Sequence, residues 1–327
     1  MNGSRLTGLM SAVVTSAVMV ACARGGGGGQ EAEQVALFTK NQTNPYFQSI
    51  RLGAENAASQ MKAGMVHYVP TKPDSIPEQM SQIEDAIIKR PDAVVFIPVD
   101  SRAMVPGVQK LNAANIPVVN LTDRTAGGDF VSFVGCDDKR LGLSAGRYLL
   151  QKMNGRGNVI IIEGVGGSAN NAARISGFRE ALGESPDVKL LASQPGNFQR
   201  LQALQVTENL LQAHPQIDGV LAANDAMALG AIEALDGANR KALVVGINGT
   251  KEAIDAIKAG KLLATSDCNG FEQGCIGVMT AIRHLRNLPV PKEFAFPQPV
   301  IDVTNYADLD LPDTERSCPM WDAVVKE

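Results

Sequence analysis

Histidine, tryptophan and cysteine are scarce in this sequence of 327 residues, which contains three, one and five of them respectively. The histidines stand far apart, and neither an H-x-x-x-H nor a C-x-x-C spacing occurs, which argues against the common metal sites. A G-x-S-x-G nucleophile motif is also absent. We therefore expect a protein that is not an enzyme and that holds neither a metal nor a cofactor. A catalytic pair of carboxylates is the alternative, because sequence alone does not reveal which carboxylates face each other.

Strong net charge and long hydrophobic runs are absent as well. The net charge is −4 at pH 7, which argues against nucleic acid or an anionic membrane surface as the main partner. The one membrane-like run, residues 6–21, is too short to span a bilayer comfortably. It is instead typical of a signal peptide, with Arg5 before an apolar stretch at residues 10–20. The rest of the chain is long enough for two globular domains.

The segment Met-Val-Ala-Cys at residues 19–22 resembles the cleavage box of bacterial lipoproteins, although methionine stands where leucine is usual. We expect residues 1–22 to form a signal peptide that ends at a lipidated Cys22; a soluble exported protein cut elsewhere is the alternative. Five glycines follow at residues 25–29, so residues 23–34 are expected to form a flexible tether. These features predict a periplasmic or cell-surface protein whose only membrane contact is a lipid anchor.

From Val35 onward, short apolar runs alternate with amphipathic segments of helical period. In the first such segment, Phe47, Ile50, Ala54 and Ala57 recur at spacings of three, four and three residues. This alternation predicts parallel sheets covered by helices on both faces, and hence an α/β protein with two doubly wound domains. The expected strands are residues 35–39, 66–69, 93–99, 117–121, 130–135, 158–163, 188–192, 219–222, 242–247 and 262–266.

Polar side chains recur just beyond the carboxyl ends of these strands. Ligands bind outside those ends in open α/β sheets, and converging amide, carboxylate and guanidinium groups suit a molecule with many hydroxyl groups. Tyr46, Phe47 and Phe198 lie at similar places and are expected to pack against an apolar ring face. Helix capping is the alternative role for each polar residue taken singly. The strand-end residues are Asn44, Asp100, Asp123, Arg124, Asn170, Asn224, Asp225, Asn248, Asp267 and Asn269.

The segment GVGGSA at residues 164–169 follows an expected strand and opens a helix, which approximates the dinucleotide pattern G-x-G-x-x-A. No acidic residue follows at the position that recognition of a nucleotide ribose requires, so a tight turn beside a ligand is the favoured interpretation. Further upstream, Asp138 of the pair Asp137–Asp138 is expected to cap the helix that follows it.

Six segments of the chain carry a resemblance to a known family. They are NPYFQSIRLGAENAA (44–58), NIPVVNLTDR (115–124), ARISGF (173–178), LASQPGNFQR (191–200), LLQAHPQIDGVLAANDAMALGA (210–231) and VVGINGT (244–250). With these segments the chain, from Val35 to about Val303, resembles the ribose-binding branch of the type I periplasmic sugar-binding proteins, the receptor components of ABC importers. The resemblance implies two Rossmann-like lobes joined by a three-segment hinge. One lobe would hold residues 35–136 and 269–298, the other residues 137–268 and 299–303, with residues 304–327 as a C-terminal tail.

The resemblance also implies ligand contacts, carried over position by position. Asp123 and Arg124 match an acidic-basic pair after the fourth strand, but this chain is one residue longer there, so Asn120 is a rival for that position. The implied contacts are Asn44, Tyr46, Phe47, Asp123, Arg124, Arg174, Phe198 and Asn224.

Several positions depart from the ribose binders. Arg174 stands where glucose- and galactose-binding relatives use an arginine, whereas the arginine of ribose binders falls near Ala172 and is absent. Relatives usually carry aspartate where this chain has Asn248, and often glutamine where it has Cys268. Because an amide both donates and accepts, the hydroxyl pattern recognised there should differ. A pentose, a hexose or a sugar alcohol therefore stays open as the ligand.

Four cysteines follow Cys22, and in an exported protein they can form disulfides in three complete pairings. The resemblance places Cys136 in the first crossing between the lobes and Cys268 in the second. We hypothesise that Cys318 bonds Cys275 and pins the tail across the lobe junction. The remaining pair lies between crossings, where a bond could restrain closure. Four buried free thiols are the alternative.

Together these features predict an extracytoplasmic solute receptor that binds a small sugar or sugar alcohol between two lobes by hinge closure. Its expected partners are that ligand and the permease subunits of an ABC importer, and we expect a monomer. The alternative is a receptor for a sugar or furanosyl signal that serves a chemoreceptor or sensor kinase. A sugar-responsive repressor is excluded, because a signal peptide stands where its DNA-binding helices would be.

Overall fold

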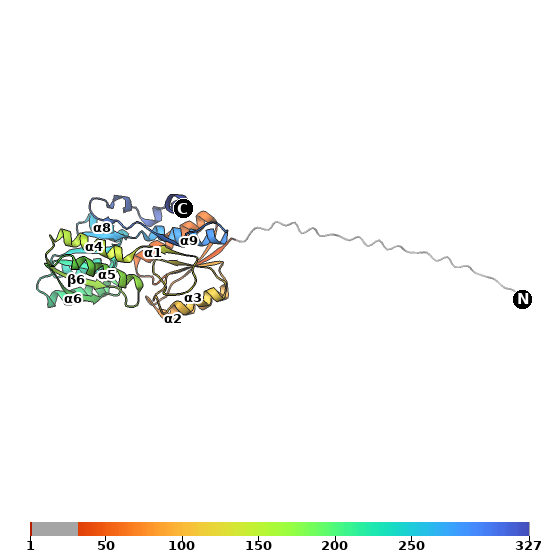
Figure 1. The fold of residues 1–327 in the computed structure, drawn as a ribbon, viewed down its shortest axis with the longest axis horizontal. Coiled ribbons are helices and arrows are strands. Elements are labelled where there is room, and N and C mark those ends of the chain that lie inside the picture. Colours follow the sequence, from red (N-terminus) through yellow and green to blue (C-terminus); the bar gives the residue numbers. More distant parts are fainter. Residues whose placement is uncertain (2–31, 327) are drawn as a thin grey trace. The chain divides into compact units, whose positions relative to one another are not determined.

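The computed structural model describes Met1 and residues 32–326, and the latter form two α/β lobes (Figure 1). The expected signal peptide, Cys22 and most of the expected tether lie outside the described residues. Among the residues that are described, no helix is both long and apolar enough to cross a membrane.

Each lobe is built on a six-stranded sheet, and nearly all neighbouring strands are parallel, as predicted. The exception is β12, which pairs antiparallel with β10. In spatial order the first sheet contains β11 (Glu293–Ala295), β5 (Ser132–Gly135), β4 (Val118–Leu121), β3 (Ala93–Phe96), β1 (Gln34–Phe38) and β2 (Gly64–Tyr68). The second sheet contains β12 (Val300–Ile301), β10 (Ala264–Asp267), β9 (Leu243–Asn248), β8 (Gly219–Ala222), β6 (Gly157–Glu163) and β7 (Val188–Pro195).

Helices connect successive strands and cover the sheets (Figure 1). Many begin at a polar residue whose side chain accepts a backbone N–H of the first turn; Ser168, for example, accepts from Asn171, and Thr250 accepts from Ala253. The helices are α1 (Pro45–Met61), α2 (Ile76–Lys89), α3 (Val105–Ala113), α4 (Asp138–Lys152), α5 (Ala169–Gly183), α6 (Arg200–Ala213), α7 (Asp225–Gly237), α8 (Lys251–Lys258), α9 (Gly270–Leu285) and α10 (Trp321–Val324).

Both faces of the first sheet are buried, which explains the near-continuous apolar strands in the sequence. Val35 and Leu37 of β1 belong to the core cluster that includes α1 and α9, whereas Ala36 and Phe38 belong to the cluster under α2 and α3. Alternate residues of one strand therefore serve two separate hydrophobic layers, as in other parallel sheets.

Helix α9 follows the second lobe in the sequence but packs closely on α1 of the first. A Cβ atom at Gly53 of α1 would lie 1.9 Å from the Phe271 carbonyl oxygen, and one at Gly274 of α9 would lie 2.0 Å from the Ile50 carbonyl oxygen. Only glycine allows the two helices to approach this closely. These contacts attach α9 to the first lobe.

The chain crosses between the lobes three times: after β5, after β10 and between β11 and β12. The third crossing lies beside the other two. The backbone N–H of Phe296 donates to the Gly135 carbonyl at 2.9 Å, and that of Asp267 donates to the Pro299 carbonyl at 2.9 Å. Three adjacent extended segments therefore form the hinge.

Two disulfides flank this hinge. One joins Cys136 to Cys268, with Cα atoms 6.2 Å apart, and so links the first crossing to the second. The other joins Cys275 of α9 to Cys318, with Cα atoms 5.6 Å apart. Cys318 belongs to the C-terminal segment, residues 302–326, which follows β12 and which we call the strap.

Candidate functional site

The carboxyl ends of strands from both sheets border a narrow cavity of about 10 Å³ in this arrangement of the lobes, which we call the cleft cavity. Its walls combine amides, aromatic rings and two cations. Every lining residue except Lys40 was named from the sequence. The lining residues are Lys40, Asn44, Tyr46, Phe47, Asn170, Arg174, Phe198, Asn224 and Asn248.

Lys40 and Asp123 form a buried ion pair at the wall of this cavity. The Lys40 Nζ lies 2.5 Å from Asp123 Oδ2, and their side chains are 2% and 0% exposed. Asp123 also accepts hydrogen bonds from the Ser168 hydroxyl at 3.0 Å and from the Asn170 backbone N–H at 3.1 Å. Because Ser168 and Asn170 lie at the start of α5, in the second lobe, the carboxylate of Asp123 ties the two lobes together beside the cavity. Sequence analysis missed Lys40, a charged residue just beyond the first predicted strand.

Arg174 of α5 is held by three acceptors. Its Nε donates to Asp138 Oδ1 at 2.8 Å, and its Nη1 donates to the Ala223 carbonyl at 2.8 Å and to Asn248 Oδ1 at 3.0 Å. Burial raises the pKa of the Asp138 carboxyl, and the attraction of Arg174 opposes that rise. The guanidinium therefore has one fixed orientation at the cavity wall.

The sequence analysis expected Asp138 to cap α4, and this expectation was wrong. The cap is Asp137, whose carboxylate accepts the Arg140 backbone N–H at 3.1 Å. The helix starts one residue earlier than the Asp138 interpretation required, so Asp138 lies inside its first turn and turns its carboxylate toward Arg174.

Aromatic side chains from both lobes line the cleft cavity, Tyr46 and Phe47 from α1 and Phe198 from the loop before α6. A Cβ atom at Gly164 would lie 2.1 Å from the Phe198 ring, so the first glycine of the GVGGSA segment makes room for that ring. Its Gly167 has a φ of +85°, and a Cβ there would lie 2.1 Å from an Asp100 carboxylate oxygen of the first lobe. The glycines thus allow a tight turn and close approach to Phe198 and Asp100 at the cleft.

Two asparagines serve as helix caps and as cavity walls at the same time. Asn224 Oδ1 accepts the Met227 backbone N–H at 2.9 Å, and Asn44 Oδ1 accepts the Tyr46 N–H at 3.1 Å. The carbonyl oxygen of each side chain is used by its helix, which leaves the amide NH₂ as the group on the cavity side. One N–H of the Asn224 amide donates to the Phe198 carbonyl at 3.4 Å, so its second N–H is the one offered to the cavity. Asn248, which ends β9, has a φ of +134°, and such strain clusters at functional sites.

Arg124 lies outside the cleft cavity, although it was predicted to contribute. Its side chain is 51% exposed, pairs with Glu293, and stacks with its guanidinium carbon 3.5 Å from the centre of the Phe133 ring. The rival residue Asn120 is buried, and its amide donates to the Phe96 and Asp123 carbonyls. After β4 the chain turns Asp123 inward, where it pairs with Lys40, and Arg124 outward. Neither member of the expected pair lines the cleft cavity, and Asp123 acts there through Lys40.

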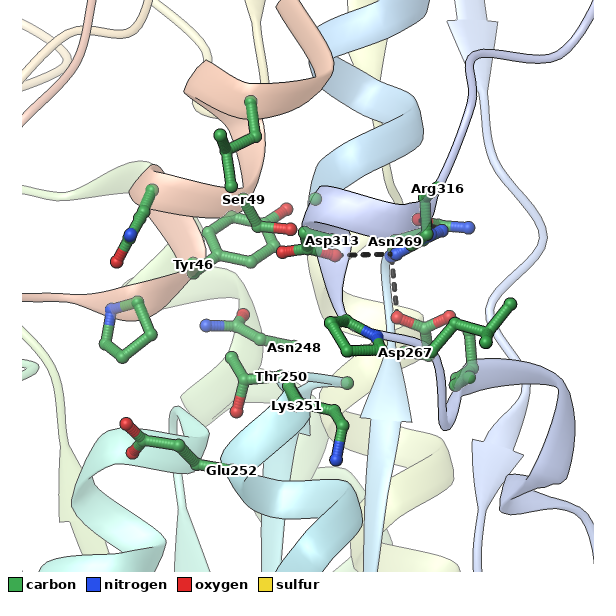
Figure 2. A pocket seen from close by; sticks show the side chains of 18 of the residues that line it. Tyr46, Ser49, Asn248, Thr250, Lys251, Glu252, Asp267, Asn269, Asp313 and Arg316 are labelled. Carbon is green, nitrogen blue, oxygen red and sulfur yellow. Dashed lines mark hydrogen bonds and ion pairs between the residues drawn. The ribbon is translucent and has the colours of Figure 1, made fainter. Parts of the chain in front are cut away.

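Asp267 and Asn269 lie at a second cavity, of about 260 Å³, bordered by α1, the start of α8 and the strap (Figure 2). We call it the strap cavity. The Asp267 carboxylate accepts the Asn269 backbone N–H at 2.7 Å, and Asn269 Oδ1 accepts from Arg316 Nη2 of the strap at 2.7 Å. Burial raises the pKa of Asp267 to about 7, although the Asn269 N–H and Arg316 favour its charged form. Tyr46 and Asn248 line both cavities.

The polar groups of both cavities are arranged for hydrogen bonding. Over the described part of the chain, no group of three or more histidine, cysteine, aspartate or glutamate side chains is placed to hold a metal ion. The cleft cavity instead offers amide and cationic donors beside aromatic ring faces.

Comparison with known proteins identifies the family. A model described as "Periplasmic binding protein domain" matches residues 35–289. The ribose import binding protein of Escherichia coli strain K12 is 33% identical over 295 residues, which cover 90% of this chain and 97% of that protein. The structure of an ABC transporter periplasmic solute-binding protein from Actinobacillus succinogenes 130z with bound D-allose is 35% identical, with a TM-score of 0.80 over 84% of this chain and 99% of the other. An ABC transporter solute-binding protein from Bacillus halodurans C-125 with bound myo-inositol is 26% identical, with a TM-score of 0.79 over 86% and 99% of the two chains. The chain therefore belongs to the periplasmic binding protein family.

Proposed function

We propose that this protein is an extracytoplasmic solute receptor that binds one small sugar or sugar alcohol in the cleft cavity and delivers it to an ABC importer. The observation that carries the proposal is the cavity lining. Asn44 and Asn224 offer amide donors, Lys40 and Arg174 are each fixed by a carboxylate, and Phe198 offers a ring face. Such a set can pair with adjacent hydroxyl groups and cover the C–H face of a sugar ring.

The charges of the lining support a neutral ligand. Lys40 is compensated by Asp123, and Arg174 is compensated by Asp138, so the cavity has no unbalanced buried charge from these groups to attract an ion. The relatives named for ribose, D-allose and myo-inositol all take neutral polyhydroxylated molecules, which agrees with this chemistry. We therefore propose a pentose, a hexose or a related polyol as the ligand class.

Binding is proposed to act through hinge closure. The two lobes already share contacts at the cleft, including the Asp123 hydrogen bonds and a 3.3 Å hydrogen bond from the Ser101 N–H to the Gly167 carbonyl. A sugar that contacts both lobes binds the closed state better than the open state and shifts the population toward closure. The permease then distinguishes closed from open receptor, and no chemical step is required.

A panel of pentoses, hexoses and sugar alcohols tests this function by thermal shift. Ligand at 100 times its Kd should stabilise the protein by about 2.7 kcal/mol, which raises the melting temperature by a few degrees. A folded protein whose melting temperature responds to none of these compounds would contradict the proposal. The strongest compound then serves for calorimetry.

Asn224 provides the site-specific arm of that test. Asn224→Ala should weaken sugar binding by about 1–3 kcal/mol, because hydroxyl groups are left without a partner in a closed cavity. Asn224→Ser is the sharper variant, since serine keeps the helix cap but lacks the amide. We expect Asn224→Ser to lose affinity in calorimetry while keeping most of the stability that Asn224→Ala loses; wild-type affinity in both variants would remove Asn224 from the site.

We further propose that Cys22 is lipidated and that the protein is held at a bacterial membrane by this anchor alone. The sequence of residues 19–22 and the glycines after it support the proposal. Cys22→Ser should move the protein from the membrane fraction to the soluble fraction or leave it uncleaved, with sugar binding unchanged. Wild-type protein found entirely in the soluble fraction would overturn the anchor.

A further inference from the structure

The strap begins on the second lobe and is held there by side-chain contacts. Its Asp310 pairs with two lysines of α8, Lys258 at 2.7 Å and Lys251 at 3.4 Å. Asp302, at the start of the strap, accepts a hydrogen bond from the Tyr148 hydroxyl of α4. These contacts are ionic or hydrogen-bonded. Apart from the polypeptide chain, this end of the strap is therefore attached to the second lobe noncovalently.

The other end of the strap is attached to the first lobe, and here the attachment is covalent. Cys318 is bonded to Cys275 of α9, and its backbone N–H donates to Asn56 Oδ1 of α1 at 2.9 Å. Beyond it, the Trp321 ring lies against Arg283 of α9, with the guanidinium carbon 4.4 Å from the ring centre. The strap is therefore a fourth connection between the lobes, beside the three crossings of the hinge.

Between these two ends the strap forms a wall of the strap cavity. Figure 2 shows Asp313 and Arg316 of the strap together with Ser49 of α1 and Thr250 at the start of α8. Ser49 belongs to the first lobe and Thr250 caps α8 in the second, so separation of the lobes at the cleft would widen this cavity. It would also move the Asp310 end of the strap away from its Cys318 end.

We propose that the strap is a restraint that favours the closed arrangement of the lobes and slows sugar release; the second part rests on the proposed function. The eight Cα–Cα steps from Asp310 to Cys318 reach about 26–29 Å when fully extended. The segment contains a 3₁₀ turn at Asp313–Glu315 and is therefore not fully extended, so the covalent chain tolerates opening. Opening instead costs the contacts of Asp310 with α8, because Arg316 contacts Asn269 and Glu272 at the start of α9 and so stays with the Cys318 end of the strap. Helix α8 starts three residues after Asn248, a wall of the cleft cavity, so the restraint acts next to the site.

Hydrogen–deuterium exchange of the sugar-free full chain tests the restraint without a ligand. The Ser101 N–H bonds the Gly167 carbonyl, and the Asn170 N–H bonds Asp123, so both amides are protected only while the lobes are closed. Asp310→Asn keeps the side-chain size and removes the charge. Because exposed ion pairs contribute about 0.2–1 kcal/mol, we expect exchange at these amides about 1.4–5 times faster than in wild type.

Two further variants of the chain show whether faster exchange comes from the strap. Cys275→Ser combined with Cys318→Ser frees the opposite end and should accelerate the same amides at least as much as Asp310→Asn. Asp236→Asn removes another surface ion pair of the second lobe, with Lys261 at 2.8 Å, and should leave them unchanged. Exchange within strand β8 should stay at the wild-type rate in all variants that fold as wild type does.

Wild-type exchange at the two cleft amides in Asp310→Asn would overturn the restraint, as would acceleration confined to one of the two strap variants. Salt offers an independent check, because about 1 M salt should accelerate the wild type but add little to Asp310→Asn. These outcomes do not depend on sugar binding. If no sugar raises the melting temperature but exchange is accelerated in the strap variants, the proposed function is refuted and the restraint stands. If a sugar binds but exchange stays at the wild-type rate, the restraint is refuted and the proposed function stands.

Discussion

Arg174→Met is expected to lower the free energy of unfolding by about 3–5 kcal/mol, since it strands the Asp138 carboxylate, whose side chain is 12% exposed, and removes the donor from the Ala223 and Asn248 oxygens. Chemical denaturation at pH 7 measures this loss. The deficit should shrink in acid, because the pKa of Asp138 is already raised by burial and loses the opposing effect of Arg174 in the variant. The carboxyl then accepts a proton instead of remaining an unpaired charge.

Two variants show whether the loss comes from the ion pair. Arg179→Met changes an arginine of the same helix whose side chain is 52% exposed, and it should cost less than about 1 kcal/mol. Combining Arg174→Met with Asp138→Asn should recover part of the stability, because the stranded charge is gone. A double variant no more stable than Arg174→Met would show that the loss has another source.

Asp267→Asn is expected to flatten the dependence of stability on pH. The folded-state pKa of Asp267 is raised from 3.8 to about 7, so the folded protein holds this proton more tightly than the unfolded chain. Its stabilising contribution is fully present below about pH 4 and is lost as the pH rises through about 7. Between these limits, wild-type stability should fall relative to the variant by up to about 1.4 kcal/mol per pH unit.

Denaturation curves from pH 4 to 8 test this expectation, and Glu78→Gln checks the sign. Hydrogen bonds from Thr71 and Lys72 lower the pKa of Glu78, so its contribution is present above the ordinary value of 4.5 and is lost as the pH falls. The two variants should therefore change the profile in opposite directions. Parallel profiles for wild type and Asp267→Asn would contradict a raised pKa at Asp267.

The parallel-sheet architecture was predictable because the pattern that encodes it is local. A strand such as β3, with residues 93–96 all apolar, is buried on both faces and contrasts with the amphipathic helices beside it. All ten strands expected from such runs are present. Strands β11 and β12 were not among them, because they have only three and two residues, at the edges of the two sheets, and make no apolar run of strand length.

The site was harder to predict because the spacing of residues does not show in which direction each side chain points. Position after a strand correctly brought Asn44, Asn170 and Asn224 to one cavity. The same rule could not tell that Arg124 turns away from its neighbour Asp123. Nor could it separate the cleft cavity from the strap cavity, because the latter depends on a C-terminal segment that runs from α8 of the second lobe to α9 of the first.

The sequence contains a single tryptophan, Trp321, and it lies on the strap against Arg283, whereas the aromatic walls of the cleft cavity are Tyr46, Phe47 and Phe198. Tryptophan emission from this protein is therefore a built-in optical probe of strap attachment. A sugar titration followed by tryptophan emission reports occupancy of the cleft cavity only if closure disturbs the contact between Trp321 and Arg283. Unchanged tryptophan emission during a sugar titration is thus compatible with tight binding. Binding must then be measured by calorimetry or by mass spectrometry.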